Sequence, residues 1–138
     1  MTTERNSSML LSGAQPKHTV RPRYTIVTNA AKFPLGQVVA TPGSLELLDT
    51  HSISPVSLLT RHLQGDWGDV AGDDASLNEL ALQDGSRIFS IYRLASDDAI
   101  NATPHSKRHT LPTAWVITDA ASDTGIRAAT TLLLPEDY

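Results

Sequence analysis

Residues 41–65 read TPGSLELLDTHSISPVSLLTRHLQG, and this stretch decides how the chain folds. Thr41 and Ser54 each precede a proline, which is typical of a helix N-cap followed by the first helical residue. Leucines recur after both starts at helical spacing, and Gly65 is suited to ending the second helix. The stretch therefore predicts an αα-hairpin over residues 42–63.

A third short helix is expected after the turn-rich segment 65–69. Asp73 or Asp74 is the expected N-cap, and Asp84-Gly85 is the expected end. The apolar residues at helical spacing indicate its buried face, which we expect to consist of Leu77, Leu80 and Ala81.

Four stretches are rich in residues that favour strands: 37–40, 88–94, 115–118 and 128–134. No helix is expected between the last three, so these strands should pair antiparallel. The predicted fold class is α+β: an N-terminal αα-hairpin plus a third short helix, packed on a three- to four-stranded, mainly antiparallel sheet.

Charge and composition divide the chain of 138 residues into an arm and one domain. Residues 1–32 are polar, lack apolar periodicity and are expected to be a disordered basic arm. Residues 1–35 carry five basic side chains and one acidic one, whereas residues 36–138 carry six basic and fourteen acidic ones. The domain is therefore expected to span residues 33–138, with a flexible loop at 95–113.

Several functional classes are excluded by what the sequence lacks. The absence of cysteine removes disulfides, thiolate metal sites and cysteine nucleophiles. No apolar run approaches the roughly 20 residues that a transmembrane helix needs, and no export signal is recognisable. A phosphate-binding loop and a nucleophile elbow are also absent. We therefore expect a cytoplasmic protein with no membrane contact, no cofactor and no assigned catalytic residue.

The segment 65–69, Gly-Asp-Trp-Gly-Asp, is the candidate functional loop. Asp66 and Asp69 flank Trp67, and the two carboxylates could hold a divalent cation or exchange protons. The simpler interpretation is a turn in which Trp67 covers a small core. The spacing differs from that of an EF-hand, so the sequence assigns no metal ligand.

Histidines near the helix ends are further candidates. Arg61 and His62 are expected to be polar neighbours of Asp66, whereas His51 can simply favour the end of the first helix. His105 and His109 are four residues apart, but nearby prolines argue against a stable helix that would bring them together.

Arginines of the predicted sheet form another candidate group. Arg87 and Arg93 are six residues apart, so a strand places them on one face. With Arg127 they could line a cationic stripe, although ordinary surface charge on a solvated sheet face is the favoured explanation.

Five blocks, in this order, resemble a family of small bacterial proteins carried on plasmids and integrative elements: residues 33–43, residues 53–55 with 61–69, and residues 84–88, 115–118 and 130–135. Members are usually labelled plasmid-related proteins, and some are labelled as type I restriction enzyme modification subunits. A methyltransferase needs several parallel strands and a glycine-rich cofactor loop, and this sequence predicts neither. The resemblance implies an accessory role on a mobile element, without an activity.

Three functions are consistent with these observations. The favoured one is a protein-interaction module that modulates a host nucleic-acid-processing or defence system. The second is a DNA-associated regulator that uses the 42–63 hairpin, with weak phosphate contacts from the basic arm. The third is a small metal-dependent hydrolase at Asp66 and Asp69.

Overall fold

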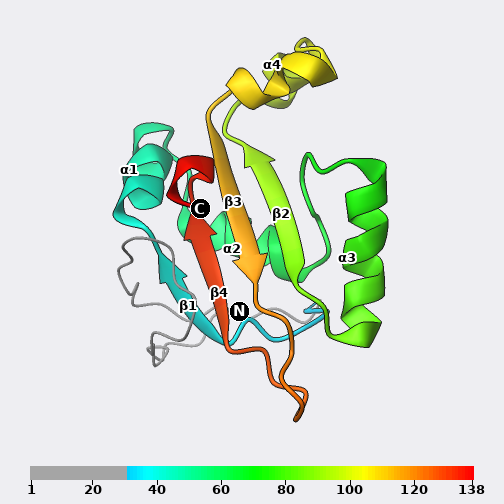
Figure 1. Ribbon diagram of the computed structural model, residues 1–138. Coiled ribbons are helices and arrows are strands. Elements are labelled where there is room, and N and C mark those ends of the chain that lie inside the picture. The colour runs from blue at the N-terminus through cyan, green and yellow to red at the C-terminus, as the bar shows by residue number, and fades with distance from the viewer. Residues whose placement is uncertain (1–30) are drawn as a thin grey trace.

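The computed structural model describes residues 31–138, which form a four-stranded sheet with helices (Figure 1). The strands are β1 (Gln37–Ala40), β2 (Ile88–Arg93), β3 (Thr113–Thr118) and β4 (Ala129–Leu133). Their order in the sheet is β1-β4-β3-β2. The predicted antiparallel pairs β2–β3 and β3–β4 are confirmed, whereas β1 pairs with β4 in parallel.

The predicted αα-hairpin is confirmed as α1 (Pro42–Thr50) and α2 (Pro55–Leu63). The hydroxyl of Thr41 accepts the backbone N–H of Ser44, and that of Ser54 accepts the N–H of Val56. Both caps satisfy donors that a helix start leaves unpaired.

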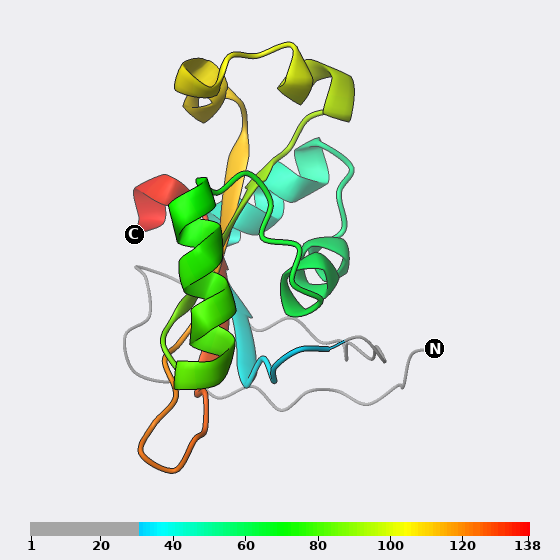
Figure 2. The same ribbon diagram turned by 90° about the vertical axis from the view of Figure 1, so that its right-hand side faces the viewer.

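The two faces of the sheet differ in what covers them. The helices α1 and α2 lie on one face, with Leu48, Leu58 and Leu59 in the main core (Figure 2). On the opposite face, which we call the open face, the short 3-10 helix η2 (Pro135–Asp137) is the only helix within residues 31–138 that lies against the strands (Figures 1 and 2). None of the described helices is long and apolar enough to cross a membrane.

The helix α3 (Gly72–Asp84) runs along β2, the last strand on its side of the sheet. The side-chain amide of buried Asn78 donates to the carbonyl of Phe89 and accepts its backbone N–H, at 2.8 and 3.0 Å. Asn78 thus occupies the hydrogen-bonding groups that another strand would use, and so protects the edge.

Two expectations about α3 are wrong. Its N-cap is Ala71, which makes no side-chain cap, while Asp73 and Asp74 lie in the first turn, where their charge favours the helix dipole. Leu77 and Leu80 are 61% and 54% exposed, because α3 turns Asn78 and Ala81 toward the sheet instead. Of the predicted buried face, Ala81 alone is buried.

The segment 95–113 is not the structureless loop that its composition suggests. It contains α4 (Asp97–Asn101) and the 3-10 helix η1 (His105–Thr110). Its flexibility stays a prediction. At the other predicted boundary, Lys32 donates its backbone N–H to the carbonyl of Leu63, so this last residue of the predicted arm contacts the domain. The rest of the arm, up to residue 30, lies outside the described residues.

Candidate functional site

The loop Gly65–Asp69 attaches to β2 through backbone contacts. The N–H of Ile91 donates to the carbonyl of Trp67, and the N–H of Asp69 donates to the carbonyl of Ile91. Gly68 between them has a φ of +74°, and a Cβ there would overlap the Ile91 carbonyl. A glycine is therefore required for the loop to lie this close to the strand.

Trp67 is 6% exposed, which confirms its expected place over a small core with Phe33 and Leu63. Its indole N–H donates to a carboxylate oxygen of Glu79 on α3 at 2.9 Å. The side chain thus connects the loop, α2 and α3, and its role is structural.

Asp66 is exposed and paired. The guanidinium of Arg61 donates from Nε and Nη2 to its two carboxylate oxygens, at 2.6 and 3.3 Å. Partial burial opposes ionisation of Asp66, but the hydrogen bonds from Arg61 and from the N–H of Gly68 outweigh it and lower the pKa. The hydroxyl of Tyr92 donates to the backbone carbonyl of Asp66 and holds the loop against β2.

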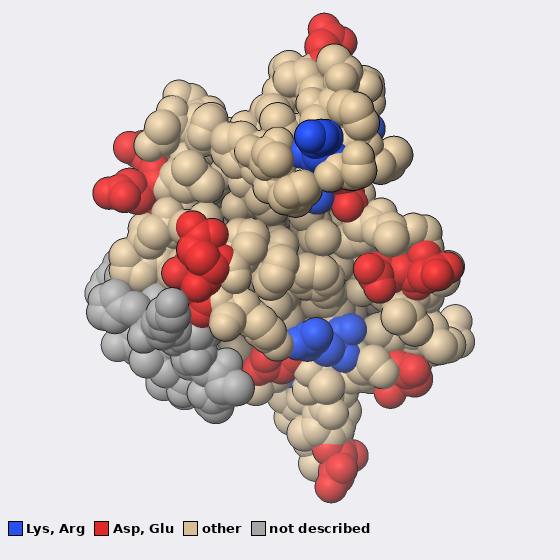
Figure 3. All heavy atoms as spheres, turned by 45° about the horizontal axis from the view of Figure 1, so that its top comes forward, with Lys and Arg blue, Asp and Glu red and all other residues tan. Residues whose placement is uncertain are grey.

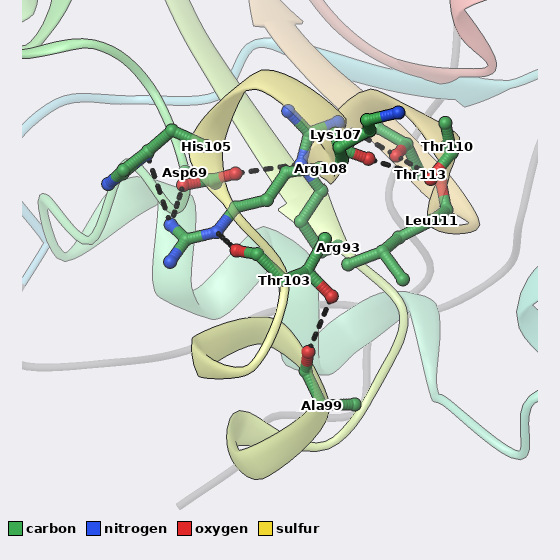
Figure 4. Close-up of polar contacts among 10 residues, drawn as sticks. All are labelled: Asp69, Arg93, Ala99, Thr103, His105, Lys107, Arg108, Thr110, Leu111 and Thr113. Atoms are coloured by element: carbon green, nitrogen blue, oxygen red, sulfur yellow. Dashed lines mark hydrogen bonds and ion pairs between the residues drawn. The ribbon is translucent and has the colours of Figure 1, made fainter.

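Asp69 joins two distant parts of the chain (Figure 4). Its carboxylate accepts one hydrogen bond from Nε of Arg93 on β2, at 2.8 Å, and another from Nη1 of Arg108 on η1, at 2.9 Å. All three side chains are at least four-fifths buried. Burial opposes ionisation of Asp69, but the two arginines prevail and lower its pKa. Asp69 therefore anchors the 95–113 segment to the sheet.

An open pocket of about 210 Å³ lies beside this loop, lined by Asp66, Asp69, Arg61 and Arg93 together with Asp97. The two loop carboxylates already neutralise arginines, which leaves little negative charge for a cation. No group of three potential metal-ligating side chains occurs within residues 31–138. The geometry does not support the metal-dependent chemistry considered for Asp66 and Asp69.

His62 does not join Asp66, contrary to expectation. It is fully buried, with Nδ1 2.6 Å from Oγ of Ser90 and Nε2 2.9 Å from Oγ1 of Thr118. The Thr118 hydroxyl lies 2.7 Å from that of Thr130, which donates to the carbonyl of Leu35. The sequence missed this network because its members come from α2 and three different strands.

The network assigns the tautomer of His62. The single hydroxyl proton of Thr130 is used on Leu35, so Thr130 must accept the proton of Thr118. Thr118 then accepts Nε2–H of His62, and Nδ1 accepts the hydroxyl of Ser90. With this tautomer, each hydroxyl and imidazole proton of the network has one acceptor.

The Ser90–His62 contact has the geometry of a nucleophile with its base, but it is inaccessible to solvent. Both side chains are fully buried. Burial, assisted by repulsion from Arg127, lowers the pKa of His62 to about 3, which makes the imidazole a weak base at neutral pH. The network is part of the core.

The cationic stripe, the less favoured alternative for Arg87, Arg93 and Arg127, does not form. Arg93 pairs with Asp69, and Arg87 donates to the phenol oxygen of Tyr138 at 2.6 Å. Arg127 is 6% exposed and donates to the backbone carbonyls of Ala81, Ser86 and Asp119. The three guanidinium groups serve separate structural contacts.

The remaining histidines lie apart from the loop chemistry. His51 is the exposed C-cap of α1. His105 and His109 both lie in η1, where Nδ1 of His105 approaches Nη1 of Arg108 at 3.4 Å. A 3-10 helix aligns residues three apart rather than four, so their spacing does not bring them onto one face.

Apolar surface gathers on α3 and on the open face. Leu77 and Leu80 are exposed, and half-buried Phe89 and Trp115 lie ring edge to ring face with centroids 5.0 Å apart. Trp115 in turn lies 6.0 Å from the ring of Tyr138, which is 70% exposed. Sequence reasoning missed this surface, because it assigned both leucines to the core.

No protein-family model, curated protein or solved structure matches the chain.

Proposed function

We propose that this chain is a protein-interaction module that binds its partner through the outer side of α3 and the adjoining open face. The exposure of Leu77 and Leu80, beside the aromatic residues of the open face, carries this proposal, since a contiguous exposed apolar patch marks an interaction site on a soluble domain. The aromatic row of Phe89, Trp115 and Tyr138 supplies the residue types that are enriched at interfaces.

The charge around this surface supports a protein partner. Figure 3 shows uncharged surface near the centre of this side of the molecule, with basic groups next to it and acidic groups nearer the margin. An apolar centre with a charged rim is the usual anatomy of a protein interface. The resemblance to plasmid-related proteins suggests a setting in which the partner is a host or element-encoded protein of a nucleic-acid-processing or defence system.

The DNA-regulator alternative has less support. The helix α2 turns Leu58, Leu59 and His62 into the core, and its exposed Arg61 pairs with Asp66. Residues 31–138 carry seven basic and fourteen acidic side chains, a balance that repels phosphate. Binding by the basic arm concerns residues outside the described part of the chain.

A capture experiment in cells of the native host tests the proposal. A photo-crosslinking amino acid at position 80 should give a defined crosslinked product, whereas the same group at exposed position 46 of α1 should give none. Replacing Leu77 and Leu80 by serine should abolish capture of the same partner by the tagged protein. Replacing Ile126, an exposed isoleucine elsewhere, should preserve it.

Thermal melts should show that these variants remain folded, because surface substitutions usually change stability by about 0.5 kcal/mol or less. Undiminished capture by the folded double serine variant would refute the proposed surface.

A further inference from the structure

The exposed side of α3 has the spacing of a coiled-coil seam. Asp73, Leu77, Leu80 and Asp84 are separated by four, three and four residues, the alternation of d and a positions in a heptad repeat. All four side chains are exposed. The seam therefore has two leucines at its centre and one aspartate at each end, over about 16 Å of helix.

The seam is separate from the face that α3 uses within its own domain. Asn78 and Ala81 are the buried residues of α3, and Glu79 accepts a hydrogen bond from the indole N–H of Trp67. Leu77 precedes Glu79 by two residues, so it lies on nearly the opposite side of the helix. This face of α3 is apolar at its centre without serving the core.

The aspartates at the ends of the seam make no direct ion pair with a basic side chain of the described residues. None of the three ion pairs within residues 31–138 includes Asp73, Asp74 or Asp84. Asp84 accepts the N–H of Ser86, and the positive charge of Arg127 acts on it without a direct ion pair. Carboxylates at the margin of an apolar contact favour a partner with positive charge at the matching positions.

We infer that the seam binds one amphipathic helix whose apolar centre is flanked at both ends by lysine or arginine. This inference rests on the proposed function and names the chemistry of the partner. A helix fits because heptad spacing places side chains of one helix into the spaces between those of another. The aspartates then meet basic side chains on the partner, about three turns apart.

The same charges argue against two other occupants. A second copy of this chain would bring aspartates at a and d positions against each other, and like charges at close range are unfavourable. A single-stranded nucleic acid could stack bases on Trp115 and Tyr138, but its phosphates would approach the acidic ends of α3. A basic helix satisfies both the apolar centre and the charged ends.

A pair of model peptides tests the inference with the full chain. Each is a fluorescein-labelled alanine-based helix of about 18 residues, carrying two leucines at a and d positions. Lysine flanks the leucines in one peptide, and glutamate replaces it in the other. In fluorescence anisotropy at low salt, the lysine peptide should bind at least tenfold more tightly, and the preference should shrink as salt rises.

Variants separate the apolar contribution from the charged one. Leu77→Ser with Leu80→Ser should weaken binding of the lysine peptide at least tenfold. Asp73→Asn with Asp84→Asn should make the two peptides bind about equally. Glu46→Gln with Asp49→Asn removes the same charge from exposed sites on α1 and should leave the preference intact.

Three other results of these experiments would overturn the inference. These results are equal binding of both peptides by the unmodified chain, no binding up to millimolar peptide, or a seam-dependent dimer in light scattering. They are distinguishable from failure of the proposed function. If the double serine variant still loses its host partner, the interaction surface stands and only the basic helix is rejected.

Discussion

Lowering the pH should destabilise the folded chain through one buried side chain, His62. The folded state holds this imidazole neutral with a pKa of about 3, whereas an unfolded chain protonates it near 6.5. Below pH 6.5 the unfolded state therefore binds more protons, and stability falls with pH. Above pH 6.5 the imidazole is neutral in both states and its contribution to stability is complete.

The size of the effect follows from the pKa difference. One pKa unit corresponds to about 1.4 kcal/mol, so the free energy of unfolding should fall by about 3 kcal/mol between pH 7.5 and pH 4.5. For a domain of this size that is on the order of 10 °C in melting temperature. Asp66 and Asp69, whose pKa values are lowered, lose their contribution at lower pH, below about 4.

Urea denaturation at several pH values, followed by circular dichroism, measures this slope. His62→Gln should cost about 1–3 kcal/mol at neutral pH, because it leaves part of the Ser90–Thr118 network unpaired. The same variant should remove most of the pH dependence between 7.5 and 4.5. His51→Gln makes the same change at an exposed histidine and should keep the full slope. An identical slope in the unmodified chain and His62→Gln would refute the reasoning.

Three further perturbations test the contacts of the loop and the sheet edge. Asp69→Asn should lower the free energy of unfolding by about 2–4 kcal/mol and raise hydrogen exchange in residues 97–111, because it leaves two largely buried arginines without their carboxylate. Asp66→Asn should lower it by less than about 1 kcal/mol, because its ion pair is exposed. Equal effects of the two substitutions would contradict the anchoring role of Asp69. Asn78→Ala should cost about 1–3 kcal/mol in urea denaturation and increase light scattering on storage, because it exposes the backbone groups of Phe89 at the sheet edge. Trp67→Ala should lower the free energy of unfolding by about 3–5 kcal/mol, and Trp67→Phe should lower it clearly less. A small loss of stability for both variants in thermal melts would show that the indole does not cover its core.

Local signals account for what the sequence predicted correctly. Thr41 and Ser54 cap their helices with their own hydroxyls, so the two starts depend on residues within a few positions. The strands after residue 88 pair with their neighbours in sequence, which is the commonest arrangement. Fold class could therefore be predicted from patterns in short windows.

Contacts between distant residues account for what it missed. Asp69 and Arg108 are 39 positions apart, and no local pattern links them. Helical periodicity indicated that Leu77 and Leu80 form an apolar stripe, but periodicity does not say whether a stripe meets the chain's own core or another molecule. The role of Asn78 could not be predicted from the sequence, because a buried polar residue becomes recognisable only with its backbone partners in place.

The parallel pairing of β1 with β4 has a consequence for synthesis of the chain. During translation β1 leaves the ribosome long before β4, the strand with which it pairs within residues 31–138. It must therefore wait for that partner while more than 80 residues are added. Nascent chains that stop before Ala129 lack both the partner of β1 and one partner of β3. Such chains present unpaired strand edges, the feature that makes folding intermediates prone to association. Completion of the sheet is thus delayed until β4 emerges. Premature termination before β4 should therefore impair folding as much as loss of β1 does.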